Sequence, residues 1–508
     1  MKPIFRSWFR TRQSRIRRRL DRTKDTATSR PVLSSRPIDY EVSHRHRAIT
    51  HGGIGAIHML AHRLGLPQAI DERLHLLKVH LPYHESDHVL NIAYNPLCHG
   101  TCLQDIELRR NDDAFLDALG ARRIPDPTTA GDFCRRFTQA HIDALQNAID
   151  EARRTVWAEQ PPSFFNRATI DMDGTLVGTT GSCKAGMDIA YNGTWGYHPL
   201  VLTLAETGEV LRLLNRSGNR PSHEGAAGQA DQAIWLCLQA GFRRTVLRGD
   251  TDFSQTQHLD RWQALPGVYF IFGYDAMTNL TELADALPAA AWKPLARPAR
   301  YEVKTEPRKR PDKVKDRIVR ERKFEVLRLK SEEVAEFDYR PSACQNTYRM
   351  VVIRKHISKE KGEQVLSPEV RHFFYITNDR ELTAEGVVFE ANDRCNQENL
   401  LAELHGGVRA LQAPVNTLES NGAWMVMTAL AWTLKAWWAL MLPVSDRWPK
   451  EHGEEKQRVL RLEFKSFVNA FVTIPCEVLQ TGRRLVLRVL GWNPYLMTFF
   501  RLVSHLRQ

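Results

Sequence analysis

The sequence has few cysteines, and they are not spaced for a shared structural task. Eight cysteines are scattered through 508 residues, which excludes the dense disulfide framework of a small secreted domain. The closest pair, Cys98 and Cys102, encloses His99, but no second Cys or His pair follows at zinc-site spacing. We therefore expect a reduced, cytoplasmic protein without a structural zinc site.

Long apolar runs are also scarce. The N-terminus lacks the apolar stretch and the cleavage site of a secretory signal. Residues 423–442 are apolar enough to span a bilayer, yet this run stands alone and carries several tryptophans. We interpret it as a buried helix and expect no membrane association. A Gly-rich loop between a strand and a helix is missing too, which argues against a dinucleotide-dependent enzyme.

Positive charge, by contrast, is in excess. The formal net charge is +12, and basic residues outnumber acidic ones most clearly in residues 1–30 and 300–330. Clustered positive charge predicts a polyanionic partner, most simply nucleic acid. A solvated or unstructured tail is the alternative for either segment taken alone.

The apolar pattern changes along the chain and predicts an α/β protein built from several parts. Helical spacing extends from Gly53 to Trp157, and β-like runs punctuated by glycine begin near Phe164. The interval between Asp250 and Glu398 exceeds any loop of a compact domain, so an inserted domain is expected there. The expected parts are a basic arm (1–50), a helical DNA-binding domain (51–160), a catalytic domain in two pieces (161–280 and 371–445), a basic β-rich insertion (281–370) and a helical C-terminal region (446–508).

A short helix in the N-terminal part carries two adjacent arginines. The turn at residues 125–129 delivers a threonine N-cap to a helix that contains Arg135 and Arg136. Such a helix could enter a DNA groove as a recognition helix. A plain helical bundle fits the same pattern.

Three carboxylates stand in settings that suit metal chemistry. Asp173 and Asp250 each end a β-like run, and Glu398 lies in a helical pattern. Hard Mg²⁺ ions take oxygen ligands, and a two-metal phosphodiester-cutting centre shares carboxylates from rigid elements. Asp171 and Asp173 lie two residues apart on a strand and face the same way, so either could be the first ligand. An exposed strand end is the alternative.

The surroundings of Glu398 add a second signal. At roughly 100° per residue, one helical stripe holds Arg394, Glu398, Leu401 and His405. A stripe that combines Arg, Glu and His does not face a core. The alternative is a solvated face held by salt bridges.

Together these residues resemble a bacterial insertion-sequence transposase of the DDE class. The matching segments are Asp173-Gly174-Thr175, the Arg-Gly-Asp-Thr-Asp-Phe run around Asp250, and Arg394-x3-Glu398. The similarity is to the branch whose last carboxylate lies in a Y-x2-R-x3-E-x6-K signature after a β-rich insertion. It implies an RNase H-like mixed sheet flanked by helices, with an N-terminal helical domain and a β-rich insertion domain.

The resemblance also implies an activity and its partners. Asp173, Asp250 and Glu398 would hold two Mg²⁺ ions, with Mn²⁺ as a substitute, for DNA cleavage and strand transfer. The partners would be double-stranded DNA, namely the terminal inverted repeats and the target, bound by a homodimer. Arg394 would contact phosphate, and the place of action would be the nucleoid in a bacterial cytoplasm.

Two positions depart from the signature. Its Tyr position is Ala391 and its Lys position is His405, and the family's residues there contact the DNA backbone near the cut. His405 can still donate to phosphate, with full charge only when protonated. These departures keep two alternatives open: an inactive DNA-binding relic of a transposase, and an RNase H-like nuclease of recombination or repair.

Overall fold

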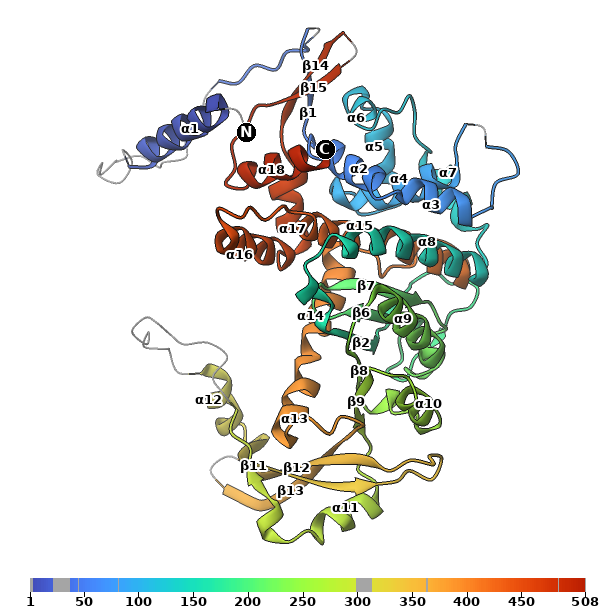
Figure 1. Cartoon of the computed structure of the whole chain (residues 1–508), viewed down its shortest axis with the longest axis vertical. Helices are drawn as coiled ribbons and strands as arrows, with labels where there is room; N and C mark the ends of the chain where they lie inside the picture. The colour runs from blue at the N-terminus through green and yellow to red at the C-terminus, as the bar shows by residue number, and fades with distance from the viewer. Residues whose placement is uncertain are drawn as a thin grey trace.

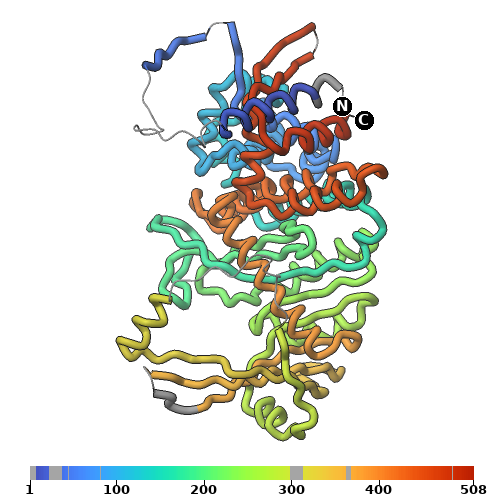
Figure 2. The backbone as a smooth tube through the Cα atoms, turned by 90° about the vertical axis from the view of Figure 1, so that its left-hand side faces the viewer, coloured from blue at the N-terminus to red at the C-terminus, as the bar shows by residue number. Residues whose placement is uncertain are grey.

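The computed structural model describes residues 3–21, 37–43, 45–80, 82–297, 313–361, 364–482 and 484–507. Three regions follow one another along the long axis of the molecule (Figure 1, Figure 2). Helices from both ends of the chain form one end, the core of a mixed sheet lies in the middle, and long antiparallel strands form the other end.

Nine strands of the described residues form one mixed sheet in the order β10-β11-β12-β13-β9-β8-β2-β6-β7. Around β2, strands β6 and β7 continue antiparallel on one side, and β8 and β9 continue parallel on the other. This arrangement with flanking helices confirms the expected α/β, RNase H-like fold class. The core strands are β2 (Ala168–Gly174), β6 (Leu200–Leu204), β7 (Glu209–Leu214), β8 (Thr245–Gly249) and β9 (Val268–Tyr274).

Helices cover both faces of this core, which explains why β6 and β8 are buried at every position. Helix α9 packs against β2, β6, β7 and β8, whereas α13 packs against β9 and the long strands, and α15 against β7. The helices that follow or cover the core are α9 (Ala226–Ala240), α10 (Leu259–Gln263), α11 (Thr278–Asp285), α12 (Val314–Glu321), α13 (Ala384–Asp393), α14 (Cys395–Ala402), the π-helix η6 (Glu403–Gly407) and α15 (Leu418–Leu440).

The insertion differs from the separate domain that we expected. Its strands continue the central sheet, because β13 pairs antiparallel with β9, Phe374 opposite Tyr274. The expected boundary at residue 370 falls inside β13, so the insertion and the catalytic sheet share one hydrogen-bonded ladder. The added strands are β10 (Lys293–Pro294), β11 (Glu325–Tyr339), β12 (Tyr348–Lys361) and β13 (Gln364–Thr377).

Residues 54–158 fold into helices, as their apolar spacing predicts, and α4 and α8 pack directly against α15. These helices are α2 (Ile54–Arg63), α3 (Leu66–Arg73), α4 (Glu85–Leu97), α5 (Ile106–Arg110), α6 (Asp113–Ala118), α7 (Pro127–Cys134) and α8 (Gln139–Ala158). Short 3-10 helices are η1 (Leu103–Asp105), η2 (Pro162–Asn166), η3 (Thr251–Phe253), η4 (Thr256–His258) and η5 (Ala289–Ala291).

The chain ends carry more structure than the sequence pattern suggested. Within the expected basic arm, α1 (Pro3–Asp21) is a helix, and its Phe9 is buried against Phe500 of α18 (Leu496–Leu506). The C-terminal region contains α16 (Pro449–Leu460), α17 (Phe464–Phe467) and the π-helix η7 (Val468–Val472), as expected for a helical segment. It also contains an unexpected hairpin of β14 (Cys476–Thr481) and β15 (Arg484–Val489), which pairs with β1 (Arg47–Ile49).

Helix α15 is the buried helix expected from the apolar run, and every residue from Ser420 to Leu440 is buried. The helix packs against α4, α8 and β7. A search of the described residues finds no helix with the length and apolar character needed to cross a membrane.

A buried carboxylate joins α8, β7 and α15. Glu209 is fully buried and accepts hydrogen bonds from the indole nitrogens of Trp157 at 3.0 Å and Trp437 at 2.8 Å. Arg153 Nε donates to the same carboxylate at 3.1 Å, and Thr207 Oγ1 donates at 2.7 Å. Four donors thus satisfy both oxygens of this buried carboxylate.

Replacing Glu209 with alanine should lower the free energy of unfolding by about 3–5 kcal/mol, because buried donors including Arg153 lose their acceptor. Urea unfolding followed by circular dichroism would measure the change. The matched control is Glu224→Ala, whose exposed pair with Arg220 should contribute less than about 0.5 kcal/mol. Equal effects of the two substitutions would show that Glu209 does not hold the three elements together.

Candidate active site

The two aspartates on β2 have different environments although their side chains face the same way. Asp171 is almost fully buried, and both of its oxygens are occupied: Arg248 donates through Nε at 2.6 Å and through Nη2 at 2.8 Å. Arg248 stands opposite Asp171 on the parallel neighbour β8. Both oxygens of Asp171 are thus engaged in an ion pair, which favours Asp173 as the carboxylate that is available for a ligand.

Asp173 lies two residues further along β2, next to the last residue of the strand. Arg394 Nη1 donates to its carboxylate at 3.1 Å. Burial raises the pKa of Asp173 to about 6, Arg394 opposes the shift, and the neighbouring carboxylates of Asp250 and Glu398 add to it. Asp250 and Glu398 therefore both lie close enough to Asp173 to disfavour its ionised form.

Asp250 follows β8 directly, so the parallel strands β2 and β8 present their carboxylates at the same edge of the sheet. Burial raises the pKa of Asp250, while Arg394 lowers it. The backbone N–H of Asp252 donates to Asp250 Oδ1 at 3.0 Å, which fixes the carboxylate at the start of a 3-10 turn. Gly249 is required here, since a Cβ would lie 2.7 Å from the Cβ of Phe253.

Glu398 is exposed on α14, and the residue before it anchors the helix to the sheet. Gln397 is buried, and its Nε2 donates to the backbone oxygens of Asp171 at 3.1 Å and Val201 at 3.0 Å. These bonds link α14 to β2 and β6, the antiparallel strands beside the aspartates. The sequence pattern singled out Glu398 but missed Gln397, because an amide carries no signal of its own.

The expected helical stripe around Glu398 is interrupted at both ends. Arg394 is the residue at which α13 ends and α14 begins, and His405 lies in the π-helix that follows α14. Leu401 is buried, whereas Glu398 is exposed. Regular helical spacing therefore does not continue from Arg394 to His405.

His405 is engaged by protein atoms. Its Nε2 lies 2.9 Å from Thr175 Oγ1, and Thr175 is the second residue after Asp173. Burial lowers the pKa of His405, which favours the neutral form of the ring. The structure places His405 as a link between η6 and the end of β2, close to the carboxylates but not as a free cation.

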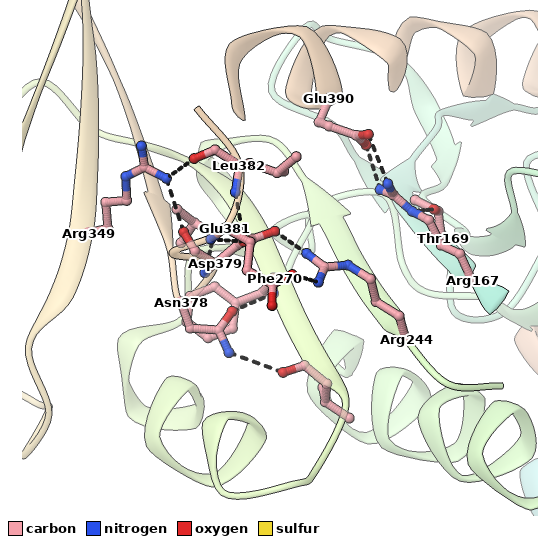
Figure 3. A network of polar contacts seen from close by, with 12 residues as sticks. Arg167, Thr169, Arg244, Phe270, Arg349, Asn378, Asp379, Glu381, Leu382 and Glu390 are labelled. Atoms are coloured by element: carbon pink, nitrogen blue, oxygen red, sulfur yellow. Dashed lines mark hydrogen bonds and ion pairs between the residues drawn. The ribbon is translucent and has the colours of Figure 1, made fainter. Parts of the chain in front are cut away.

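A network of ion pairs fixes the junction between the long strands and α13 (Figure 3). Arg244 pairs with Asp379 and with Glu381, and Asn378 accepts from the backbone N–H of Phe270 at 2.9 Å. Arg167 reaches Glu390 on α13 through both terminal nitrogens. Because α13 leads directly to Arg394 and α14, this network determines where Glu398 can lie.

The two arginines of the short N-terminal helix lie elsewhere. Arg135 caps the C-terminus of α7, pairs with Asp132, and is exposed together with Arg136. The residue that caps the N-terminus is Asp126, which accepts from the backbone N–H of Thr129 at 2.9 Å, and not the expected threonine. Helix α7 lies among the N-terminal helices, across α15 from α14 (Figure 1).

The carboxylates suit a divalent cation chemically, but Arg394 engages Asp173 in the structure. Asp173, Asp250 and Glu398 supply the hard oxygen donors that Mg²⁺ prefers. Within the described part of the chain, no three His, Cys, Asp or Glu side chains are arranged to hold a metal ion. Arg394 engages one oxygen of Asp173, Oδ2, through Nη1.

Comparison with known families decides what kind of protein carries this site. A family model described as "Transposase DDE domain group 1" matches residues 34–508. The chain belongs to this family. It is therefore a transposase, and transposases of the DDE class are DNA-cutting and strand-transfer enzymes that generally use divalent metal ions.

Two further comparisons add little to this assignment. A search of curated proteins finds no match to the transposase chain. Among solved structures, the chain is similar to a piggyBac transposase synaptic complex with hairpin DNA, at 8% sequence identity. That match covers 83% of this chain and 81% of the other, and its TM-score of 0.37 is too low to carry an argument.

The contrast between the two β2 aspartates predicts opposite effects on stability. Asp171→Asn should lower the free energy of unfolding by about 3–5 kcal/mol, because it leaves Arg248 charged and buried without its partner. Asp173→Asn in the same strand should cost far less at pH 8, since burial already disfavours the ionised form of Asp173. Urea unfolding of both variants at pH 8 compares them, and a larger loss for Asp173→Asn would reverse the assignment.

Proposed function

We propose that this transposase cleaves DNA at the ends of an insertion sequence and joins those ends to target DNA. The observation that supports this proposal best is that Asp173 and Asp250 stand at the ends of two paired parallel strands, to which Gln397 ties the helix of Glu398. Membership of the transposase family supplies the reaction class. Double-stranded DNA with terminal inverted repeats and the target duplex would be the substrates.

Asp173, Asp250 and Glu398 would hold two Mg²⁺ ions, with Mn²⁺ as a substitute, and Asp171 would stay in its ion pair. When bound, such ions activate a water or a 3′ hydroxyl and stabilise the leaving oxygen of the phosphodiester. The chain itself contributes rigid placement, because two carboxylates stand on hydrogen-bonded strands and the third on a helix anchored by Gln397. Geometry of this kind lowers the entropic part of the barrier.

Arg394 would serve as the phosphate contact at the centre. Its guanidinium faces Asp173 and also acts electrostatically on Asp250, so it lies where a scissile phosphate would approach the carboxylates. Arginine suits phosphate because its planar group donates two parallel hydrogen bonds. His405 would support this arrangement through Thr175 and would not replace the missing lysine as a cation.

DNA binding would extend over basic surfaces outside the centre. Helix α12 and the adjoining start of β11 carry an excess of exposed Lys and Arg residues, and Arg135 and Arg136 are exposed at the other end of the molecule. Such charges contribute sequence-independent affinity that weakens as salt rises. Because two element ends must be processed together, we propose a homodimer on DNA, acting at the bacterial nucleoid.

Replacing Asp250 or Glu398, the two proposed metal ligands outside β2, should abolish cleavage. For Asp250→Ala and Glu398→Ala we expect at least about a thousandfold loss of Mg²⁺-dependent cleavage of end DNA, with binding of that DNA changed less than about threefold. Gel assays of cleavage and fluorescence anisotropy of labelled ends measure the two properties separately.

The matched control for these variants is Asp393→Ala, an exposed carboxylate on the preceding helix, which should cleave normally. Parallel loss of binding and cleavage in Asp250→Ala and Glu398→Ala would mean that the two residues maintain the fold. A wild-type protein that binds ends but never cuts them, with Mg²⁺ or Mn²⁺, would identify an inactive relic.

The affinity of the site for metal ions should depend on pH in the mildly acidic range. The pKa of Asp173 is raised to about 6, mainly by burial, so protons compete with the cation for this carboxylate below pH 6. The dissociation constant for Mn²⁺ should therefore rise about tenfold per pH unit below pH 6 and change little through Asp173 above it. Calorimetric titration between pH 5 and 8 tests this, and a constant affinity down to pH 5 would contradict it.

A further inference from the structure

Four nitrogen-bearing side chains lie close together where the N-terminal helices contact the C-terminal region. They are His51 before α2, His99 after α4, Arg109 on α5 and Lys465 on α17. The ring centroids of His51 and His99 are 5.6 Å apart. Burial lowers the pKa of His51 to about 4 and also lowers that of His99, and the charge of Arg109 adds to both shifts. Lys465 lowers the pKa of His99 further, so positive charge gathers at this junction.

The loop that carries His51 is fixed to the C-terminal region by its backbone. The N–H of Gly53 donates to Val472 O at 3.1 Å. A Cβ on Gly53 would lie 1.8 Å from Phe471 O, so only glycine permits this close approach. His51 is therefore held against the end of η7, the segment that leads to Thr473.

His99 has a strained backbone. Its φ of 63° lies in the left-handed region, which residues other than glycine rarely adopt. Its Nε2 lies 2.9 Å from Thr473 Oγ1. The loop is closed by Gly100 N–H, which donates to Asn95 O at 2.8 Å, and by Asn95 Nδ2, which donates to Cys102 O at 2.8 Å. Strain of this kind persists where the surroundings enforce it, and it is concentrated at functional sites.

The positive charges of this junction are not neutralised by the chain itself. Across the described ranges, neither Arg109 nor Lys465 is paired with a carboxylate. Arg109 Nη2 donates to the backbone oxygen of Cys98, but its Nε is buried and finds no acceptor among the described residues. A buried donor without an acceptor is costly, and so is the approach of like charges. An anion with several oxygens offsets both costs, and phosphate is such an anion.

Helix α17 connects this junction to the catalytic region. It packs against η6, and the N–H of Phe464 donates to Glu403 Oε2 at 3.0 Å. Glu403 follows Glu398 by five residues, a rise of about 7.5 Å along a helix. Lys465 is the residue after Phe464, so one DNA duplex, at about 3.4 Å per base pair, reaches both places within a few base pairs.

We propose that His51, His99, Arg109 and Lys465 form a pocket for one backbone phosphate of the DNA end, a few base pairs from the cut. The proposal rests on the proposed function for the identity of the DNA. His99 and Lys465 are exposed at the mouth of the pocket, whereas His51 and Arg109 are half-buried at its base. A phosphate contact carries no sequence information, so the pocket fixes the register of the duplex and reads no base.

The test replaces the phosphates of the DNA end one at a time by uncharged methylphosphonate linkages. Binding is measured by fluorescence anisotropy without divalent ions, so that no cleavage occurs. In wild type, one linkage near the cut should weaken binding by about 10- to 100-fold, the range for losing charge-assisted hydrogen bonds. In Lys465→Gln and His99→Gly the effect of that linkage should shrink at least about threefold, whereas other linkages keep theirs.

Two controls separate the phosphate contact from effects on the fold. Glycine adopts the backbone conformation of His99 without strain, so His99→Gly should unfold at the same urea concentration as wild type or a higher one. Lys450→Gln removes an exposed lysine at the start of α16 and should leave the effect of every linkage unchanged.

Inorganic phosphate alone provides a second measurement that needs no DNA. It should raise the thermal unfolding temperature of wild type by more than chloride at equal ionic strength, since a ligand of the folded state stabilises it. In Lys465→Gln this difference should be smaller. Stabilisation by phosphate without any linkage that depends on Lys465 or His99 would overturn the assignment to DNA and identify a site for a free anion.

The pocket and the proposed function fail in different ways. Wild type that cleaves end DNA, while both variants keep every linkage effect, would overturn the pocket and leave the transposase activity intact. A protein that binds ends but never cuts them would contradict the proposed function, yet its linkage effects still decide the pocket. An equal loss at all linkages in His99→Gly would show that His99 maintains the fold and not a phosphate contact.

Discussion

The ion pair between Asp171 and Arg248 is the constraint on which the catalytic region depends. It joins β2 to β8, and each of these strands ends in one of the two aspartates at the sheet edge. Arg248 also donates to Glu390 O at 2.8 Å, so the same side chain holds α13. Removing two charges from water is costly. The pair fixes the register of β2 against β8. This matters because a slip of β2 by one residue would turn Asp173 to the opposite face of the sheet.

The other residues of the site fall into two groups, those that hold its elements together and the three carboxylates. Arg248, Gln397 and His405 each bond to β2 or to the residue that follows it, and each is occupied by protein atoms. Among the three carboxylates between these contacts, Asp173 and Asp250 are half-buried and Glu398 is exposed. At Asp173, Arg394 opposes the effect of the neighbouring carboxylates of Asp250 and Glu398, which disfavour its ionised form.

The sequence predicted the parts of this centre that depend on local pattern. The strands before Asp173 and Asp250, the helical setting of Glu398 and the buried helix α15 follow from apolar spacing alone. The sequence could not distinguish Asp171 from Asp173, because both face the same way and the ion pair that engages Asp171 involves Arg248, 77 positions away. The π-helix that places His405 beside Thr175 could not be predicted either, because periodicity arguments assume a regular α-helical turn.

Pairing between strands far apart in the chain accounts for the remaining differences between the predicted and the observed fold. The pairing of β1 with β14 and the ladder between β13 and β9 join segments far apart in the chain. The sequence pattern does not reveal such pairing, which is why it predicts a separate domain for the long insertion. Its continuity with the core has a mechanical meaning. The long strands and the core share one hydrogen-bonded ladder with no linker between them, so a displacement of β13 would pass through β9 to β8. Bending of the long strands would therefore strain the end of β8, the strand that Asp250 follows.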